Sequence, residues 1–202
     1  MKKRKIGILG GTFNPPHFGH LIMANEAYYA LGLDEVRFMP NAIAPHKESS
    51  GIDTETRVKM TRLAIDGQSH FRLEDIEVSG GGVSYTYETM AKLIEREPEC
   101  EFYFIIGGDM VESLHTWHRI GELAELVQFV GIGRPGYIAE TDYPVMMIDS
   151  PEMHLSSTML RERVLAGKPL TFFVPEHVET FIRKERLYGP EPDAPKSQRT
   201  PS

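Results

Sequence analysis

The fold is decided near the N-terminus by the stretch Ile6-Gly7-Ile8-Leu9-Gly10-Gly11-Thr12-Phe13-Asn14-Pro15-Pro16-His17-Phe18-Gly19-His20-Leu21. A short apolar run leads into two glycines, and helical apolar spacing begins at Leu21, so the pattern predicts a strand, a turn and a helix. Gly10 and Gly11 allow backbone N–H groups to approach a ligand closely, and the helix start adds unpaired donors and the positive end of its dipole. This combination suits a phosphate, and His17 and His20 are expected at the mouth of the turn.

The turn differs from two common phosphate-binding motifs. No Gly-Lys-Ser/Thr follows the glycines, as a Walker loop requires, and the spacing is not the G-x-G-x-x-G of a dinucleotide site. The chemistry is therefore to be read from the two histidines.

The composition limits the classes of protein to which this chain can belong. With 202 residues, 41% of them hydrophobic and 25% charged, the chain is long enough for one α/β domain, which we expect to span residues 1–188. The formal net charge of −7 argues against a general nucleic-acid binder, which needs a broad basic face. Cys100 is the only cysteine, and no apolar run has membrane-spanning length or forms a signal peptide. We therefore expect a cytoplasmic protein without nucleic-acid or membrane partners.

Strand-like and helix-like segments alternate along the chain. Strands are predicted at residues 36–40, 102–106, 128–132 and 145–148, with helices between them, and residues 71–78 are also predicted to be extended. This order is typical of the α/β class and predicts a Rossmann-like doubly wound parallel sheet of about five or six strands with helices on both faces. The Pro-rich, polar residues 189–202 predict a disordered tail.

Several residues that suit a ligand come soon after predicted strands. They are Lys47, Gly107, Asp109 and Arg134. Open α/β sheets bind ligands at the carboxyl ends of their strands, so these residues are expected to share one crevice with the histidines. A carboxylate there could accept hydrogen bonds from a ribose hydroxyl pair. Each residue alone could equally belong to a solvated turn.

Three more segments admit both a structural and a binding role. Ser84 or Thr86 could cap the helix that ends near Glu97. Trp117, in a polar setting, could pack a helix edge or stack on a heteroaromatic ring. The segment Leu155-Ser156-Ser157-Thr158-Met159-Leu160-Arg161 could be a plain capped helix, or its hydroxyls and arginine could hold phosphate oxygens.

Taken together, these segments resemble a known family. Gly10 to His20 resembles the (H/T)xGH signature of the nucleotidyltransferase superfamily, and Leu155 to Arg161 resembles its ISSTxxR motif, with Leu155 in place of Ile. Over nearly the whole chain, the sequence is similar to the bacterial nicotinate mononucleotide adenylyltransferases, which make deamido-NAD from nicotinate mononucleotide and ATP. Asn14 departs from the Asp that is more common there, which weakens any role of this position as a metal carboxylate.

The resemblance implies roles for three sets of residues. Catalysis is implied for His17, His20 and Arg161. ATP binding is implied for Gly10, Gly11, Thr12, Phe13, His17, His20, Gly107, Asp109, Ser157, Thr158 and Arg161. Binding of nicotinate mononucleotide is implied for Lys47, Tyr85, Thr86, Trp117 and Arg134. No carboxylate cluster indicates a metal site of the protein's own, and Mg²⁺ is expected to be bound mainly through nucleotide phosphates.

Other functions remain open at this stage. The two motifs do not distinguish nicotinate mononucleotide from phosphopantetheine, nicotinamide mononucleotide or a cytidylyl acceptor, and only Ser84 to Thr86 and Trp117 favour a nicotinate ring. A nucleotide sensor without catalysis is a further alternative, against which stand the intact His17, His20 and Arg161. The oligomeric state is also open, and a homodimer is one arrangement that we consider.

Overall fold

Six strands form one sheet in the order β3-β2-β1-β4-β5-β6, and every neighbouring pair runs parallel. The computed structural model describes residues 2–42, 52–80, 84–134, 136, 140–151 and 153–189. The strands are β1 Arg4–Gly11, β2 Glu35–Pro40, β3 Phe71–Leu73, β4 Cys100–Gly107, β5 Gln128–Gly133 and β6 Val145–Asp149. The predicted Rossmann-like sheet is confirmed. Its strand order reverses between β1 and β4, where sheets of this kind open a ligand crevice.

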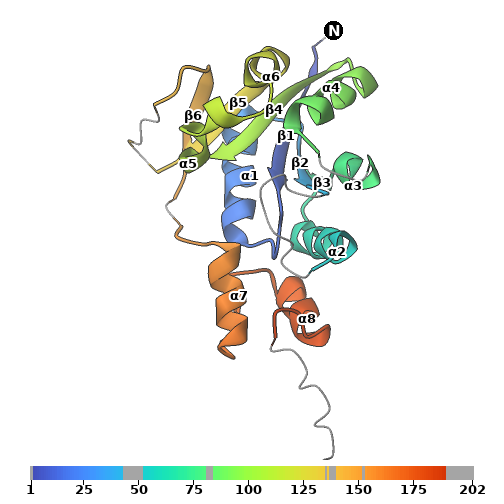
Figure 1. The fold of residues 1–202 in the computed structure, drawn as a ribbon, viewed down its shortest axis with the longest axis vertical. Helices are drawn as coiled ribbons and strands as arrows, with labels where there is room; N and C mark the ends of the chain where they lie inside the picture. The colour runs from blue at the N-terminus through green and yellow to red at the C-terminus, as the bar shows by residue number, and fades with distance from the viewer. Residues whose placement is uncertain are drawn as a thin grey trace, which may run out of the picture.

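Helices cover both faces of the sheet (Figure 1). They are α1 Phe18–Leu31, α2 Thr54–Ile65, α3 Ile76–Gly80, α4 Thr86–Arg96, α5 Gly108–Val111, α6 Ile120–Leu126, α7 Ser157–Leu165 and α8 Glu176–Lys184, with a 3-10 turn, η1, at Leu114–Thr116. Figure 1 shows α7 and α8, in orange to red, beyond the sheet and near α2. No helix in the described ranges is long and apolar enough to cross a membrane.

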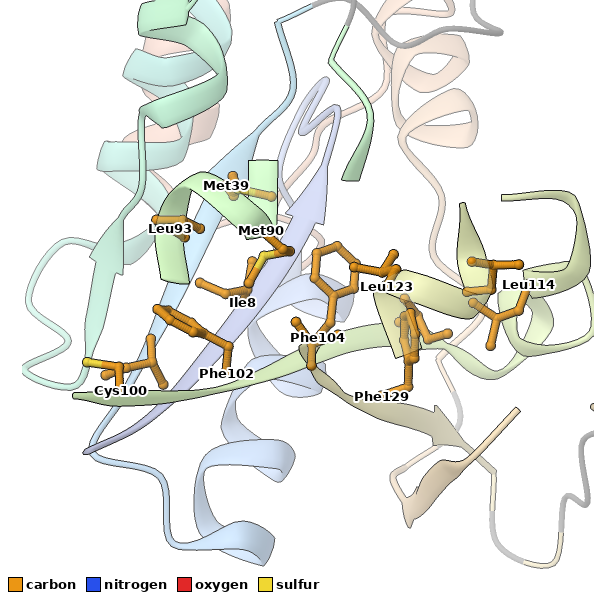
Figure 2. Packing of buried hydrophobic residues seen from close by; sticks show 14 of the residues in the cluster. Ile8, Met39, Met90, Leu93, Cys100, Phe102, Phe104, Leu114, Leu123 and Phe129 are labelled. Carbon is orange, nitrogen blue, oxygen red and sulfur yellow. The ribbon is translucent and has the colours of Figure 1, made fainter. Parts of the chain in front are cut away.

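Alternate residues of the central strands point to opposite faces, as the pleat of a strand requires. Ile8 and Phe104 belong to a cluster that packs against α4 and α6, drawn in Figure 2. Leu9 and Ile105 belong to a second cluster, which packs against α1. A third cluster joins α2, α7 and α8 through Met60, Ala64, Leu160, Val178 and Ile182. This third cluster fixes the position of α7, which carries the second sequence motif.

The prediction that residues 71–78 are extended is wrong beyond Leu73. The chain leaves β3 and forms the short helix α3, where the N–H of Ile76 donates to Glu74 Oε1 at 3.3 Å. The other carboxylate oxygen of Glu74 accepts from Arg37 at 3.1 Å and from Arg96 at 2.6 Å. The buried carboxylate of Glu74, held by partners distant in the sequence, therefore favours a helix in a segment whose apolar spacing alone favoured a strand.

Two predictions fall on residues outside the described ranges. They concern Lys47 and the tail after Gly189. These remain predictions from the sequence.

Candidate active site

A cleft of about 1790 Å³ lies at the carboxyl ends of the central strands. Its wall includes the last residues of β1, β4 and β5 and the loop after β2, as the topology predicts for this class of sheet. The predicted site residues that line it are Gly10, Gly11, Thr12, His17, His20, Tyr85, Thr86, Gly107, Asp109, Trp117, Arg134, Ser157, Thr158 and Arg161. The structure therefore brings these residues together in one cleft. Lys47 lies outside the described residues, and Phe13 does not line the cleft.

The two histidines form a stacked pair at the start of α1. Their ring centroids lie 3.7 Å apart with an interplanar angle of 25°. The backbone N–H of His17 donates to Nδ1 of His20 at 3.2 Å, so Nδ1 is an acceptor and the neutral ring carries its proton on Nε2. This bond makes Nε2 the donor nitrogen of His20.

His17 is the more buried histidine, with 6% of its surface exposed. Burial lowers its pKa to about 4, so the ring is neutral at pH 7. Its Nδ1 is buried and has no hydrogen-bond partner among the described residues. A Cβ at Gly19 would lie 3.0 Å from this nitrogen, which explains why the motif has glycine here. The His17 ring thus brings a neutral imidazole to the cleft.

The second motif docks directly on the first. The hydroxyl of Ser157 donates to the carbonyl of Pro15 at 2.9 Å, although these residues are 142 positions apart. Arg161 donates from Nη1 to the carbonyl of Asn14 at 2.9 Å and from Nη2 to the Thr158 hydroxyl at 3.1 Å. These bonds hold the N-terminal end of α7 against the turn that precedes the two histidines.

The N-terminal end of α4 forms another wall of the cleft. The sequence left open whether Ser84 or Thr86 caps this helix, but α4 begins at Thr86, and its N-cap residue is Tyr85, whose side chain makes no capping hydrogen bond. Ser84 is therefore not the N-cap residue, and its hydroxyl donates to Glu77 Oε2 at 2.6 Å. The Tyr85 ring packs on His118, with centroids 4.5 Å apart.

The position of Trp117 is compatible with both roles that the sequence left open. It packs edge-on against Phe104 and Phe129 at centroid distances of 5.9 and 6.1 Å, and it also lines the cleft. The indole is therefore held by the core while part of it remains available to a ligand.

Asp109 and Arg134 follow β4 and β5 and are both exposed. Asp109 Oδ1 lies 2.6 Å from the place of a Cβ on Gly107, so a larger residue at the end of β4 would require the Asp109 side chain to move. In the predicted Gly-x-Asp element, the carboxylate of Asp109 therefore folds back over Gly107 at the end of β4.

Comparison with known proteins identifies the family. Residues 8–163 match the cytidylyltransferase-like family. A "probable nicotinate-nucleotide adenylyltransferase" of Geobacillus thermodenitrificans is 51% identical over 92% of this chain and 86% of that protein. One from Bacillus licheniformis is 49% identical over 92% and 98%. The chain belongs to the nicotinate-nucleotide adenylyltransferase family.

Solved structures of this family share the fold. Plasmodium falciparum nicotinic acid mononucleotide adenylyltransferase complexed with NaAD superposes with a TM-score of 0.77 at 20% identity, covering 92% of this chain and 97% of that one. The same protein complexed with APC gives a TM-score of 0.76 at 20% identity and the same coverage.

Phe13 differs from the other residues to which the resemblance assigns ATP binding, because it does not line the cleft. It is 1% exposed, and its ring packs edge-on against His20 at 5.0 Å and in a tilted arrangement against Phe38 at 5.7 Å. The ring therefore supports His20 from the core side. A role of Phe13 in ATP binding, as the resemblance implied, would have to come from its backbone.

Arg57 on α2 is a residue that the sequence analysis missed. It is 5% exposed and donates to the carbonyls of Thr12, Asn41 and Ala42 at 2.8 to 2.9 Å. The guanidinium thus ties the turn after β1 to the loop after β2, two walls of the cleft. The one signal in the sequence is an arginine in a buried helical stripe, three positions before Met60.

Tyr188 was also missed, because its partner lies at the other end of the chain. Its hydroxyl donates to Asn14 Oδ1 and contacts Met60 Sδ at 3.7 Å. Burial raises the pKa of this hydroxyl, which keeps it a donor at pH 7. The amide of Asn14, which departs from the family's more common Asp, thus serves here as an acceptor.

Tyr188→Phe is expected to lower Tm by about 2–4 °C, because loss of one hydrogen bond costs about 1 kcal/mol in a protein of this size. A chain that ends at Tyr188 should keep the Tm and activity of the full chain, since residues 189–202 contain no motif residue. A chain that ends at Leu187 should lose stability. Thermal melts of the three variants test this, and a large fall in Tm for the chain ending at Tyr188 would show that the removed residues are docked.

No group of three His, Cys, Asp or Glu side chains that could hold a metal ion occurs within the described ranges. The side chains that the two sequence motifs bring to the cleft are neutral imidazoles, hydroxyls and a guanidinium. Their N–H and O–H groups suit phosphate oxygens.

Proposed function

We propose that this chain joins nicotinate mononucleotide and ATP to give deamido-NAD and pyrophosphate, the reaction after which its relatives are named. The observation that carries the proposal is the hydrogen bonding of Ser157 and Arg161 to the Asn14–Pro15 turn. It supports a single phosphate-binding surface made from two motifs. The alternative of a sensor without catalysis would not need both motifs intact in one cleft.

The chemistry requires no nucleophile from the protein. A phosphate oxygen of nicotinate mononucleotide forms a bond to the α-phosphorus of ATP while the bond from that phosphorus to the bridging oxygen breaks, and the electron pair leaves with pyrophosphate. Two anions must approach each other, so positioning and stabilisation of charge provide most of the catalysis.

The motif residues divide this task between them. His20, with its proton on Nε2, and the neutral His17 donate hydrogen bonds to ATP phosphate oxygens. Arg161 uses two N–H groups within the protein and has five in all, which leaves donors for the pyrophosphate side. Ser157 and Thr158 at the start of α7 complete that subsite.

The remaining polar groups of the cleft are assigned to the ribose and the acceptor. Gly107 and Asp109 suit a nucleotide ribose, and Arg134 suits a phosphate. Lys47 is assigned to the acceptor from the sequence alone. When Mg²⁺ is bound it neutralises part of the triphosphate charge, and we assign no side chain of this chain to it. We place this reaction in the cytoplasm.

The direct test is release of pyrophosphate from ATP and Mg²⁺ with a panel of acceptors. The proposal expects release with nicotinate mononucleotide and little with phosphopantetheine or cytidine nucleotides. Pyrophosphate release that does not depend on nicotinate mononucleotide would refute it.

The acceptor subsite gives a prediction about selectivity. Nicotinate differs from nicotinamide in charge and in having only acceptors, so selection needs donors, such as the N–H groups and the hydroxyl at Thr86. Thr86→Val is expected to narrow the preference for the acid by about tenfold, since a hydrogen bond to a charged group contributes roughly 1.5–3 kcal/mol. Trp117→Ala is the matched variant. Stacking depends on the pyridine ring and not on its substituent, so this variant should weaken the binding of both mononucleotides by similar factors. The measurement is kcat/KM for nicotinate mononucleotide divided by kcat/KM for nicotinamide mononucleotide in each variant. A collapse of this ratio in Trp117→Ala alone would reverse the two assignments.

A further inference from the structure

Among the described residues, no side chain caps the N-terminal end of α4, although Ser84 and Thr86 carry hydroxyl groups there. The first N–H groups of a helix have no partner within the helix, and a nearby Ser or Thr commonly accepts from one of them. Here Tyr85 is the N-cap residue, and its side chain makes no capping hydrogen bond. Ser84, one residue earlier, has its hydroxyl turned to another partner.

That partner is Glu77 on α3. Its Oε2 accepts from the Ser84 hydroxyl at 2.6 Å, and its Oε1 accepts from the Thr89 hydroxyl at 3.0 Å. Glu77 is 8% exposed and lines the cleft. A carboxylate is a stronger acceptor than a hydroxyl, so the Ser84 proton is fixed on this bond.

If Glu77 did not hold the Ser84 hydroxyl, this hydroxyl would have another hydrogen-bond partner within reach. Serine side chains readily accept from the backbone N–H two residues later, here that of Thr86 at the start of α4. In that arrangement the hydroxyl would occupy a backbone donor of Thr86, a residue that lines the cleft. An acceptor carboxylate would then compete with a group of the protein itself.

We propose that Glu77 is a positioning residue that withholds the Ser84 hydroxyl from α4, so that the first N–H groups of the helix stay available to the carboxylate of the acceptor. This inference rests on the proposed function, because it assumes that an acid group binds at Tyr85–Thr86. Glu77 itself does not touch the substrate in this scheme.

The test is steady-state kinetics of Glu77→Ala with nicotinate mononucleotide, nicotinamide mononucleotide and ATP. KM for the acid should rise roughly tenfold, the effect of one competing hydrogen bond, while kcat and KM for ATP stay within about threefold of wild type. The preference for acid over amide should narrow to the same degree. An unchanged KM for the acid would overturn the proposal.

Two further variants separate this role from a merely structural one. In Glu77→Ala/Ser84→Ala no hydroxyl is left to compete, so KM for the acid should return to within about threefold of Ser84→Ala alone. Glu77→Gln keeps an amide that can hold the Ser84 hydroxyl, and it should remain within about threefold of wild type. A double variant as poor as Glu77→Ala, or a Gln variant equally poor, would show that Glu77 acts through packing or through its charge.

The activity of the wild-type protein distinguishes a failure of the proposed function from a failure of the proposed role of Glu77. If wild type releases no pyrophosphate with nicotinate mononucleotide, the proposed function fails. If wild type is active and selective but Glu77→Ala has unchanged kinetics, only the role of Glu77 fails. Thermal melts of each variant show that the compared proteins are folded.

Discussion

Replacement of His20 by alanine is expected to lower kcat about 100-fold or more, by analogy with the loss of a single donor from an oxyanion site, while KM for ATP changes by less than about threefold. The Nδ1 atom of His20 accepts from the His17 N–H, which leaves Nε2–H to donate where charge develops on the transferred phosphate. Such a donor contributes mainly in the transition state. Single-turnover kinetics with saturating ATP measures the effect, and a variant within a fewfold of the wild-type kcat would contradict this role.

Two substitutions at position 20 serve as matched controls. His20→Asn retains an acceptor near the place of Nδ1 for the His17 N–H but removes the distant donor, so it should be about as inactive as the alanine variant. His20→Gln can present an N–H near the place of Nε2 and should recover part of kcat. If the Asn variant were active and the Gln variant inactive, the contribution of His20 would be its hydrogen bond to the backbone.

The parts of the fold that the sequence predicts are those with local causes. The strand, turn and helix from Ile6 to Leu31 follow from an apolar run, a pair of glycines and helical spacing within one short segment. The helix that carries Arg161 is signalled by the hydroxyls at its start, one of which, Ser156, accepts from the N–H of Met159 at 3.2 Å. The first signal lies at the carboxyl end of β1, and the packing of α7 on α2 and α8 places the second signal against it.

The parts that the sequence does not predict depend on partners far along the chain. Ile76 and Val78 alternate as in a strand, yet Glu74 begins a helix there because its carboxylate is held by Arg37 and Arg96. No local pattern contains those arginines.

Arg57 and Tyr188 are further examples, since one joins two loops and the other reaches Asn14 from the end of the described chain. Phe13 shows the reverse case. Its place in the motif implies contact with the nucleotide, but its backbone has a φ of 49° and its side chain is buried beneath His20. Proximity in sequence to a site therefore did not predict the direction of this side chain.

Gly19→Ala is expected to separate catalysis from stability, with a several-fold fall in kcat and little loss of Tm. A Cβ at this position would lie 3.0 Å from His17 Nδ1 and 3.1 Å from His17 Cε1. The His17 ring has little room to yield, because it is 6% exposed and stacked on His20. The ring must therefore shift by a few tenths of an ångström. Because a misplacement of about 1 Å at a reacting site can cost about 10²-fold in rate, this smaller shift is expected to lower kcat several-fold. Alanine meanwhile favours the helix over glycine by roughly 0.5–1 kcal/mol, which offsets part of the steric strain.

Gly121→Ala is the matched control for this prediction. Gly121 is the second residue of α6, as Gly19 is the second residue of α1, and a Cβ there would meet no atom within 4 Å. The control should therefore keep the wild-type kcat and show an unchanged or higher Tm. Paired measurements of kcat and Tm in both variants decide the matter: a Gly19→Ala protein with wild-type kcat, or one that loses activity only in proportion to a collapse of Tm, would show that the glycine is not there to make room for the His17 ring.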